Sequence, residues 1–214
     1  VVTPPADRDF FYLNESFENT ITVLDHNDEI ITNYQGIITF SGSSFTLPND
    51  YTYTSENAGV ASFYLQGANE GIENYQVADT TYSETKTTSE DIEIKEGKII
   101  VVSKFTPIGK TAVGVKIVDS AGNIIANDNS TVFTLSVSES GDRESCKVSS
   151  SSYSESGDFA VKNGTAIVYL EDDEAELVLL TPNSTPSLIG VTGEILFGSM
   201  KNRTIVPERW RIKR

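Results

Sequence analysis

The chain has 214 residues, of which 38% are hydrophobic and 22% charged, and its formal net charge is −15. A phosphate backbone would repel so acidic a chain, which argues against nucleic acid as a partner. The single cysteine, Cys146, excludes an internal disulfide, and no apolar run approaches the 18 residues of a membrane span. An acidic surface suits a secreted or surface protein.

The first half of the chain reads as short strands. Val1 to Asp7 is a proline-containing lead-in or a first edge strand. Alternating apolar residues, such as Ile21 and Val23, indicate strands with one buried face. The predicted strands are residues 10–13, 19–24, 36–40, 60–65, 73–78 and 92–94.

The second half begins near Glu96 to Lys98, and its pattern also predicts short strands. Its predicted strands are residues 98–105, 111–119, 131–137, 165–170, 176–180 and 194–197. Residues 138–157 form a Ser-rich insertion in which Cys146 to Val148 is a candidate strand. Short strands with turn signals every 8–12 residues predict an all-β fold built from antiparallel sandwiches.

One stretch occurs twice. Residues 23–33 (VLDHNDEIITN) match residues 117–127 (IVDSAGNIIAN) at a constant offset of 94. In each copy an Asp, Asp25 or Asp119, opens a tight turn between two apolar pairs, which predicts a β-hairpin. Gly122 stands where the backbone needs a positive φ, and Asp28 takes that place in the first copy.

A second match supports a duplication. Residues 59–65 match residues 164–170 at an offset of 105, so the second copy has gained 11 residues between the two matches. Two matches in the same order predict two tandem domains, residues 1–97 and 98–200. Residues 201–214 would be a basic tail or the final edge strand.

The repeated motifs resemble those of bacterial immunoglobulin-like repeats. The shared residues are Ile117 to Ile125 (IVDSAGNII), Ala58 to Phe63 (AGVASF) and Tyr75 to Val77 (YQV). The resemblance covers residues 8–95 and 98–198, and implies two Ig-like antiparallel β-sandwiches. It also implies a role in spacing, adhesion or assembly in surface proteins, adhesins or S-layer-associated proteins, with no catalytic residues.

The alternating pattern and the repeat together predict a core for each domain. In the first domain the predicted core residues are Ile21, Val23, Ile38, Phe40, Phe63, Leu65, Tyr75 and Val77. In the second they are Val113, Val115, Ile117, Phe133, Leu135, Val168, Leu170 and Leu179.

Oxygen-rich clusters are candidates for a metal site, because calcium takes six to eight oxygen ligands. The candidate ligands are Asp25, Asn27, Asp28, Asp128, Asp172 and Asp173. No D-x-D-x-D-G loop accompanies them, and the alternative is that they are solvated turns on an acidic surface. No other cofactor is expected.

The sequence contains few candidate catalytic residues. The only histidine, His26, is predicted at an exposed hairpin tip, so a Ser-His-Asp or Cys-His arrangement would have to use it. A carbohydrate- or ligand-binding accessory module of a larger secreted protein is the alternative function, with Tyr51, Tyr53 and Tyr64 as the aromatic candidates. Glycosylation sequons start at Asn14, Asn129, Asn163, Asn183 and Asn202.

The last 14 residues, KNRTIVPERWRIKR, carry six basic residues and one acid, so the other 200 carry a net charge of −20. We expect an extracellular structural or adhesive protein, a segment or protomer of a cell-surface stalk, sheath or filament. Its partners would be other copies of itself or neighbouring domains. The tail would then add as an edge strand to a neighbouring copy through Arg209, Trp210, Arg211 and Ile212.

Overall fold

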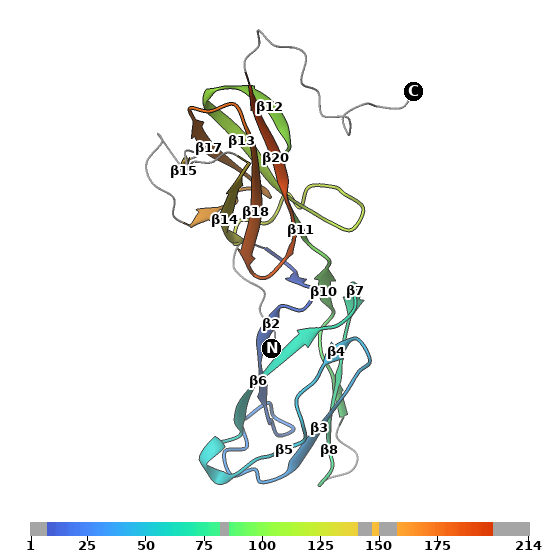
Figure 1. Ribbon diagram of the computed structural model, residues 1–214. Coiled ribbons are helices and arrows are strands. Elements are labelled where there is room, and N and C mark those ends of the chain that lie inside the picture. Colours follow the sequence, from blue (N-terminus) through green and yellow to red (C-terminus); the bar gives the residue numbers. More distant parts are fainter. Residues whose placement is uncertain (1–7, 82–85, 141–146, 150–157, 199–214) are drawn as a thin grey trace. The chain divides into compact units, whose positions relative to one another are not determined.

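The computed structural model describes residues 8–81, 86–140, 147–149 and 158–198. By its internal contacts the chain divides into two compact units, Val1–Gly97 and Lys98–Arg214. The described residues form strands and turns, together with one short 3-10 helix, η1 (Ser55–Asn57) (Figure 1). The predicted all-β class is therefore confirmed. None of the described residues lies in a helix long and apolar enough to cross a membrane.

The described residues of the second unit form a sandwich of two five-stranded sheets. One sheet has the strand order β15 (Lys147–Ser149), β17 (Thr165–Asp172), β13 (Gly109–Val118), β11 (Lys98–Val101) and β19 (Ile189–Val191). The other has the order β12 (Lys104–Pro107), β20 (Gly193–Gly198), β18 (Leu177–Thr185), β14 (Val132–Glu139) and β16 (Phe159–Ala160). β15 starts within the predicted candidate strand of the Ser-rich insertion.

The first strand of this unit passes from one sheet to the other. β11 pairs antiparallel with β13, and after Val102 and Ser103 the chain continues as β12 beside the last strand, β20. β12 and β20 run in the same direction, and so do β11 and β19. The sandwich is thus mainly antiparallel, as predicted, with short parallel pairs where its opening strand lies.

In the first unit the described strands form three smaller sheets. Their strand orders are β1 (Phe11–Tyr12), β10 (Ile92–Lys95), β7 (Gly71–Glu73); β2 (Ser16–Thr22), β6 (Val60–Gly67), β4 (Phe45–Thr46); and β5 (Tyr51–Thr52), β3 (Ile37–Ser41), β8 (Gln76–Asp79), β9 (Lys86–Thr88). β1 runs parallel to β10, as β12 does to β20. Both units therefore place an opening strand parallel to a closing one.

The two hairpins predicted from the repeat have the same backbone geometry. Each is closed by an antiparallel bridge, and the two bridges differ by the predicted offset of 94 residues: Leu24 with Ile30, and Val118 with Ile124. Asp28 has φ 64° and Gly122 has φ 88°. The positive φ expected at this turn position is therefore present in both copies.

The second repeated element begins with a glycine that lies against its hairpin. The carbonyl oxygens of Gly59 and Gly164 each accept a hairpin N–H at 2.8 Å. Both glycines have positive φ, 75° and 68°, and follow another residue with positive φ. A Cβ on either would lie less than 3.0 Å from the carbonyl oxygen of Ile31 or Ile125. Backbone conformation and lack of space therefore both require glycine at this point.

Most of the predicted core residues are buried. In the first unit Ile21, Val23 and Phe40 are only partly buried but pack against the core. The sequence prediction missed several large buried side chains, which are Phe11, Phe17, Tyr34, Phe45, Tyr53, Ile92 and Ile94 in the first unit and Ile99, Val101, Phe159, Ile195 and Phe197 in the second. Ring contacts link many of the first set, such as the stacked pair Phe11–Phe17 with centroids 4.1 Å apart.

One strand of the second unit faces the core with the opposite parity to the prediction. Val178 and Leu180 are fully buried, whereas Leu179 is only half-buried. Residues 177–180 are all apolar, so alternation along this strand cannot show which residues face inward. Leu135 is likewise only half-buried, and burial on this face of β14 falls from the buried Phe133 to the exposed Val137.

The glycine contact generates a stability prediction. Gly164→Ala should lower the free energy of unfolding by about 1–3 kcal/mol, because a methyl group must displace the carbonyl of Ile125. Denaturant unfolding followed by circular dichroism measures the loss. Gly114→Ala is the control, because a Cβ there makes only an ordinary 3.6 Å contact with Val102. Equal midpoints for the two variants would contradict the argument.

Candidate functional site

The Asp residues of the two hairpins bind their own backbone. Oδ1 of Asp25 accepts the N–H groups of Asn27 and Glu29 at 2.8 and 3.0 Å. Oδ1 of Asp119 accepts the N–H of Asn123 at 2.8 Å, and Oδ2 accepts the Asn123 amide at 3.2 Å. Each carboxylate therefore closes a turn of the kind the sequence predicted.

These hydrogen bonds favour the charged form of both acids. The backbone N–H of Glu29, and then that of Asn27, lowers the pKa of Asp25 below its usual value of 3.8. The backbone N–H of Asn123, followed by its side-chain amide, lowers the pKa of Asp119 in the same way. Both carboxylates are thus charged at neutral pH and engaged within the turn.

Asp128 is a buried acid that also binds its own loop. Oδ1 accepts the N–H groups of Ser130 and Thr131, both at 3.0 Å, and Oδ2 accepts the Thr131 hydroxyl at 2.6 Å. The carbonyl of Asp128 accepts the N–H of Gly164 at 2.8 Å. This candidate metal ligand therefore ties the loop after the second hairpin to the start of β17.

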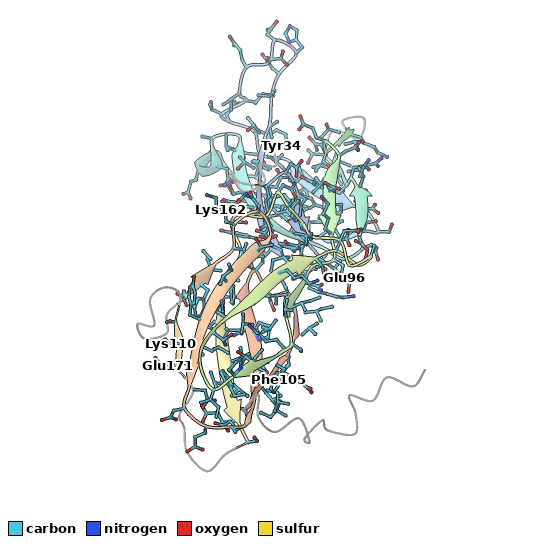
Figure 2. The ribbon with its side chains drawn as sticks, turned by 90° about the horizontal axis from the view of Figure 1, so that it is seen from above. Tyr34, Glu96, Phe105, Lys110, Lys162 and Glu171 are labelled. Atoms are coloured by element: carbon cyan, nitrogen blue, oxygen red, sulfur yellow. The ribbon has the colours of Figure 1, made fainter. Side chains whose placement is uncertain are left out.

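The third acidic cluster follows the other end of β17. Asp172 is buried and accepts the N–H of Glu174 at 2.9 Å, while Asp173 is exposed. Glu171 lies 3.9 Å from Lys110 across β13 and β17. Both residues are labelled in Figure 2. Because the eight residues of β17 separate Asp172 from the Gly164 end, the structure does not bring Asp128 and Asp172 together. In the described ranges no three His, Cys, Asp or Glu residues form a group that could hold a metal ion.

The aromatic candidates for a binding platform do not share a surface. Tyr53 is buried, donates its hydroxyl to the carbonyl of Ile21 at 3.0 Å, and has its pKa raised to about 12 by burial. Tyr51 packs edge-on against Phe63 with centroids 5.0 Å apart. Tyr64 is 68% exposed on β6. Two of the three tyrosines therefore belong to the core of the first unit.

The remaining candidates are exposed or lie outside the described residues. His26 is exposed at the tip of the first hairpin, and Cys146 is outside the described ranges. Four of the five sequon asparagines are exposed, namely Asn14, Asn129, Asn163 and Asn183. Asn202 and the predicted assembly residues Arg209, Trp210, Arg211 and Ile212 fall outside the described part of the chain.

Among the described residues, the two units differ in the strands that pair with the strand leading into the hairpin. In the second unit β13 pairs on one side with β17 and on the other with β11. The matching strand of the first unit, β2, pairs with β6 and is the edge of its sheet among the described residues. Sequence patterning could not reveal this difference, because β2 and β13 have the same alternation.

The comparisons with known proteins add structures but no family. No protein-family model matches the sequence, and no curated protein matches it. Similar solved structures include the adhesin InvE of Yersinia pseudotuberculosis, with 15% identity and TM-score 0.42, covering 89% of this chain and 57% of that one. Domains 4 and 5 of the S-layer protein SbsC have 16% identity and a TM-score of 0.34, and the match covers 63% of this chain and 69% of that one.

Bacteroides uniformis β-glucuronidase 3 is also similar, at 13% identity and TM-score 0.37, covering 89% of this chain and 23% of that one. Adhesin and S-layer structures thus occur among the similar folds, beside an enzyme. This chain spans little more than half of the adhesin structure. At TM-scores below 0.5, these similarities say nothing about activity or partners.

The lowered pKa values predict how stability depends on pH. A carboxyl group with a folded pKa below its unfolded value of 3.8 stabilises the fold above pH 3.8. That contribution is lost as the pH falls through the folded pKa. Asp119→Ala should therefore lower the unfolding midpoint at pH 7, and the difference from the unchanged protein should shrink as the pH falls below 3.8. A difference that stays constant in urea titrations from pH 7 to below pH 3.8 would contradict this role.

Calcium binding by the acidic clusters stays a prediction that titration can test. If the clusters bind calcium, calorimetry at up to about millimolar calcium, the range of extracellular modules, should give binding heat, and chelator should lower the melting temperature. Asp173→Asn is the informative variant, because Asp173 is exposed while Asp172 binds the turn. Absence of heat and of any chelator effect would leave the clusters as turn-forming residues only.

Proposed function

We propose that this chain is a non-catalytic part of an extracellular structural or adhesive protein, a segment or protomer of a cell-surface stalk, sheath or filament. The duplication of a complete Ig-like unit supports this function. A repeated domain extends a surface protein by adding copies that each have their own hydrophobic core. Each unit here has its own hairpin and its own hydrophobic core.

The use of the acids also supports a structural function. Asp25, Asp119, Asp128 and Asp172 all accept hydrogen bonds from nearby backbone N–H groups. A general acid or base needs a carboxyl group that is available to a substrate. These four carboxylates instead accept hydrogen bonds within their own loops and stabilise them.

An accessory carbohydrate-binding module is less well supported. Such a module would present several aromatic faces on one surface. Tyr53 is inside the core, and Tyr64 lies exposed on the outer face of β6 next to Glu18 and Ser62. The aromatic residues of the first unit therefore serve its interior.

Localisation and loss of function test the proposal together. Immunogold labelling of source cells with antibody against this chain should mark the cell exterior, and protease added to intact cells should remove the label. Deleting the gene should remove a surface structure visible by negative-stain microscopy, or reduce attachment to surfaces. Label confined to the cell interior, or a deletion strain with unchanged surface and attachment, would overturn the proposal.

A further inference from the structure

We propose that residues 201–214 fold back onto the outer face of a sheet in their own unit, the sheet in which β12, β20 and β18 are neighbours. We call this surface the Phe105 face, and its outward apolar residues are Phe105, Pro107, Leu177, Leu179 and Leu196. The tail packs on it through side chains, so the contact requires no unpaired strand edge. It also holds or fails independently of the function proposed above, because it does not depend on where the protein acts.

The Phe105 face is a contiguous apolar patch across three strands. The pairing register places Phe105 beside Leu196, and Leu196 beside Leu177. Their neighbours Val178 and Ile195 are fully buried, so Leu177 and Leu196, which are half-buried, point to the other side of the sheet. Phe105 itself is 55% exposed. A patch of this kind, in contrast to a single exposed side chain, is typical of an interaction site.

The described part of the chain ends at this face. Gly198, the last residue of β20, pairs with Pro107, and a Cβ on it would lie 2.9 Å from the Phe105 ring. Trp210 follows twelve residues later in the sequence. An extended chain of that length reaches at most about 40 Å, whereas three adjacent strands cover roughly 10 Å. Tethering raises the effective concentration of a segment, which favours a copy's own tail over the tail of the neighbouring copy that the sequence alone suggested.

Charge complementarity supports the same placement. Residues 171–176 (EDDEAE) contain five acids, the densest acidic run of the chain. The carbonyl of Glu176 accepts the N–H of Phe197 at 2.8 Å, so this run lies beside the end of β20, and its Asp173 is exposed. The tail has six basic residues and one acid, a net charge of +5. Its basic residues are attracted to the acidic run next to the point where the tail begins.

The first unit contains a contact of the proposed kind. There β1 runs parallel to β10, as β12 does to β20. The Arg8 guanidinium, which lies outside the strands, is 5.4 Å from the Phe10 ring centroid and 4.8 Å from that of Tyr12. An aromatic face attracts such a cation, and both rings are fully buried. The tail contains four arginines, of which Arg203 comes first, for the same contact with Phe105.

The tail also has apolar residues at a suitable spacing. Trp210 and Ile212 are two residues apart and alternate with basic residues. In an extended segment they would face one side, toward the sheet, and the basic groups the other. The tryptophan ring offers a large apolar surface to cover Phe105. Pro207 has no N–H to donate, which suits a segment held by its side chains.

Trp210 is the only tryptophan in the chain, so its fluorescence reports where the tail lies. In the full chain its emission should be blue-shifted, and less quenched by acrylamide, than in a synthetic peptide of residues 201–214. Phe105→Ser should return both signals toward those of the peptide. Tyr64→Ser removes an aromatic residue that is 68% exposed in the first unit and should change neither signal. Circular dichroism checks that both variants fold. Equal emission from the full chain and the peptide, or the same response to both substitutions, would refute the proposal.

Dilution separates a copy's own tail from the tail of another copy. Sedimentation velocity gives the concentration below which the full chain is monomeric, and the blue shift of Trp210 should persist there. A blue shift that disappears as monomers form would place the tail on a second copy and would contradict the proposal.

Removing the tail tests the face without a substitution, and so decides the matter if Phe105→Ser does not fold. Residues 1–200 contain every described strand. With the Phe105 face uncovered, they should bind more of an apolar fluorescent dye than the full chain does, and an excess of the peptide should displace the additional dye. Equal dye binding by the two proteins would show that the tail does not cover this face.

Paired acid substitutions test the charge argument. Asp173→Asn with Glu174→Gln, in the acidic run, should increase the quenching of Trp210 in the full chain. Asp50→Asn with Glu56→Gln removes two exposed acids of the first unit, which is the more acidic unit overall, and should leave the quenching unchanged. An equal effect of the two pairs, or none from the first pair, would overturn the placement of the tail on the Phe105 face.

Discussion

The backbone contact between each hairpin and the glycine that opens the next repeated strand is the constraint on which both units depend. The N–H of Val23 donates to Gly59 and that of Ile117 donates to Gly164, both at 2.8 Å. Because a side chain at either glycine would meet the hairpin carbonyl, the strand approaches as closely as backbone allows. The contact fixes the hairpin on the first sheet strand and thereby sets the register of β2 with β6 and of β13 with β17.

This contact explains which parts of the fold could be predicted from the sequence. Turn chemistry is local, so an Asp followed by a residue with positive φ predicts the hairpin without knowledge of the rest of the chain. Asp28 and Gly122 satisfy the same φ requirement with different side chains, which is why the repeat could be recognised despite the difference. The alternating strands β2 and β13 were predictable for the same reason, since each shows its buried face in its own residues.

Other features depend on packing between distant segments, and local patterns do not encode them. Because residues 177–180 are all apolar, the sequence does not show which face of β18 is buried. The parallel strand pairs depend on how segments far apart in the sequence meet in the fold. Tyr34 and Asp128 make the same backbone bond to the residue three before them. The Tyr34 ring then packs in an aromatic core, whereas the Asp128 carboxylate accepts a hydrogen bond from Thr131. The sequence around either residue does not predict this difference. The acidic clusters were ambiguous because calcium sites and Asx turns draw on the same oxygen-bearing residues.

The two copies have diverged in ways that make the chain directional. The excess acidic charge and the aromatic core lie in the first copy, whereas the second unit pairs its hairpin strand β13 with β11 and is closer to neutral. Contacts between copies of such a chain would join unlike surfaces. A contact between unlike surfaces is heterologous, so it continues from copy to copy until a ring closes or a filament forms.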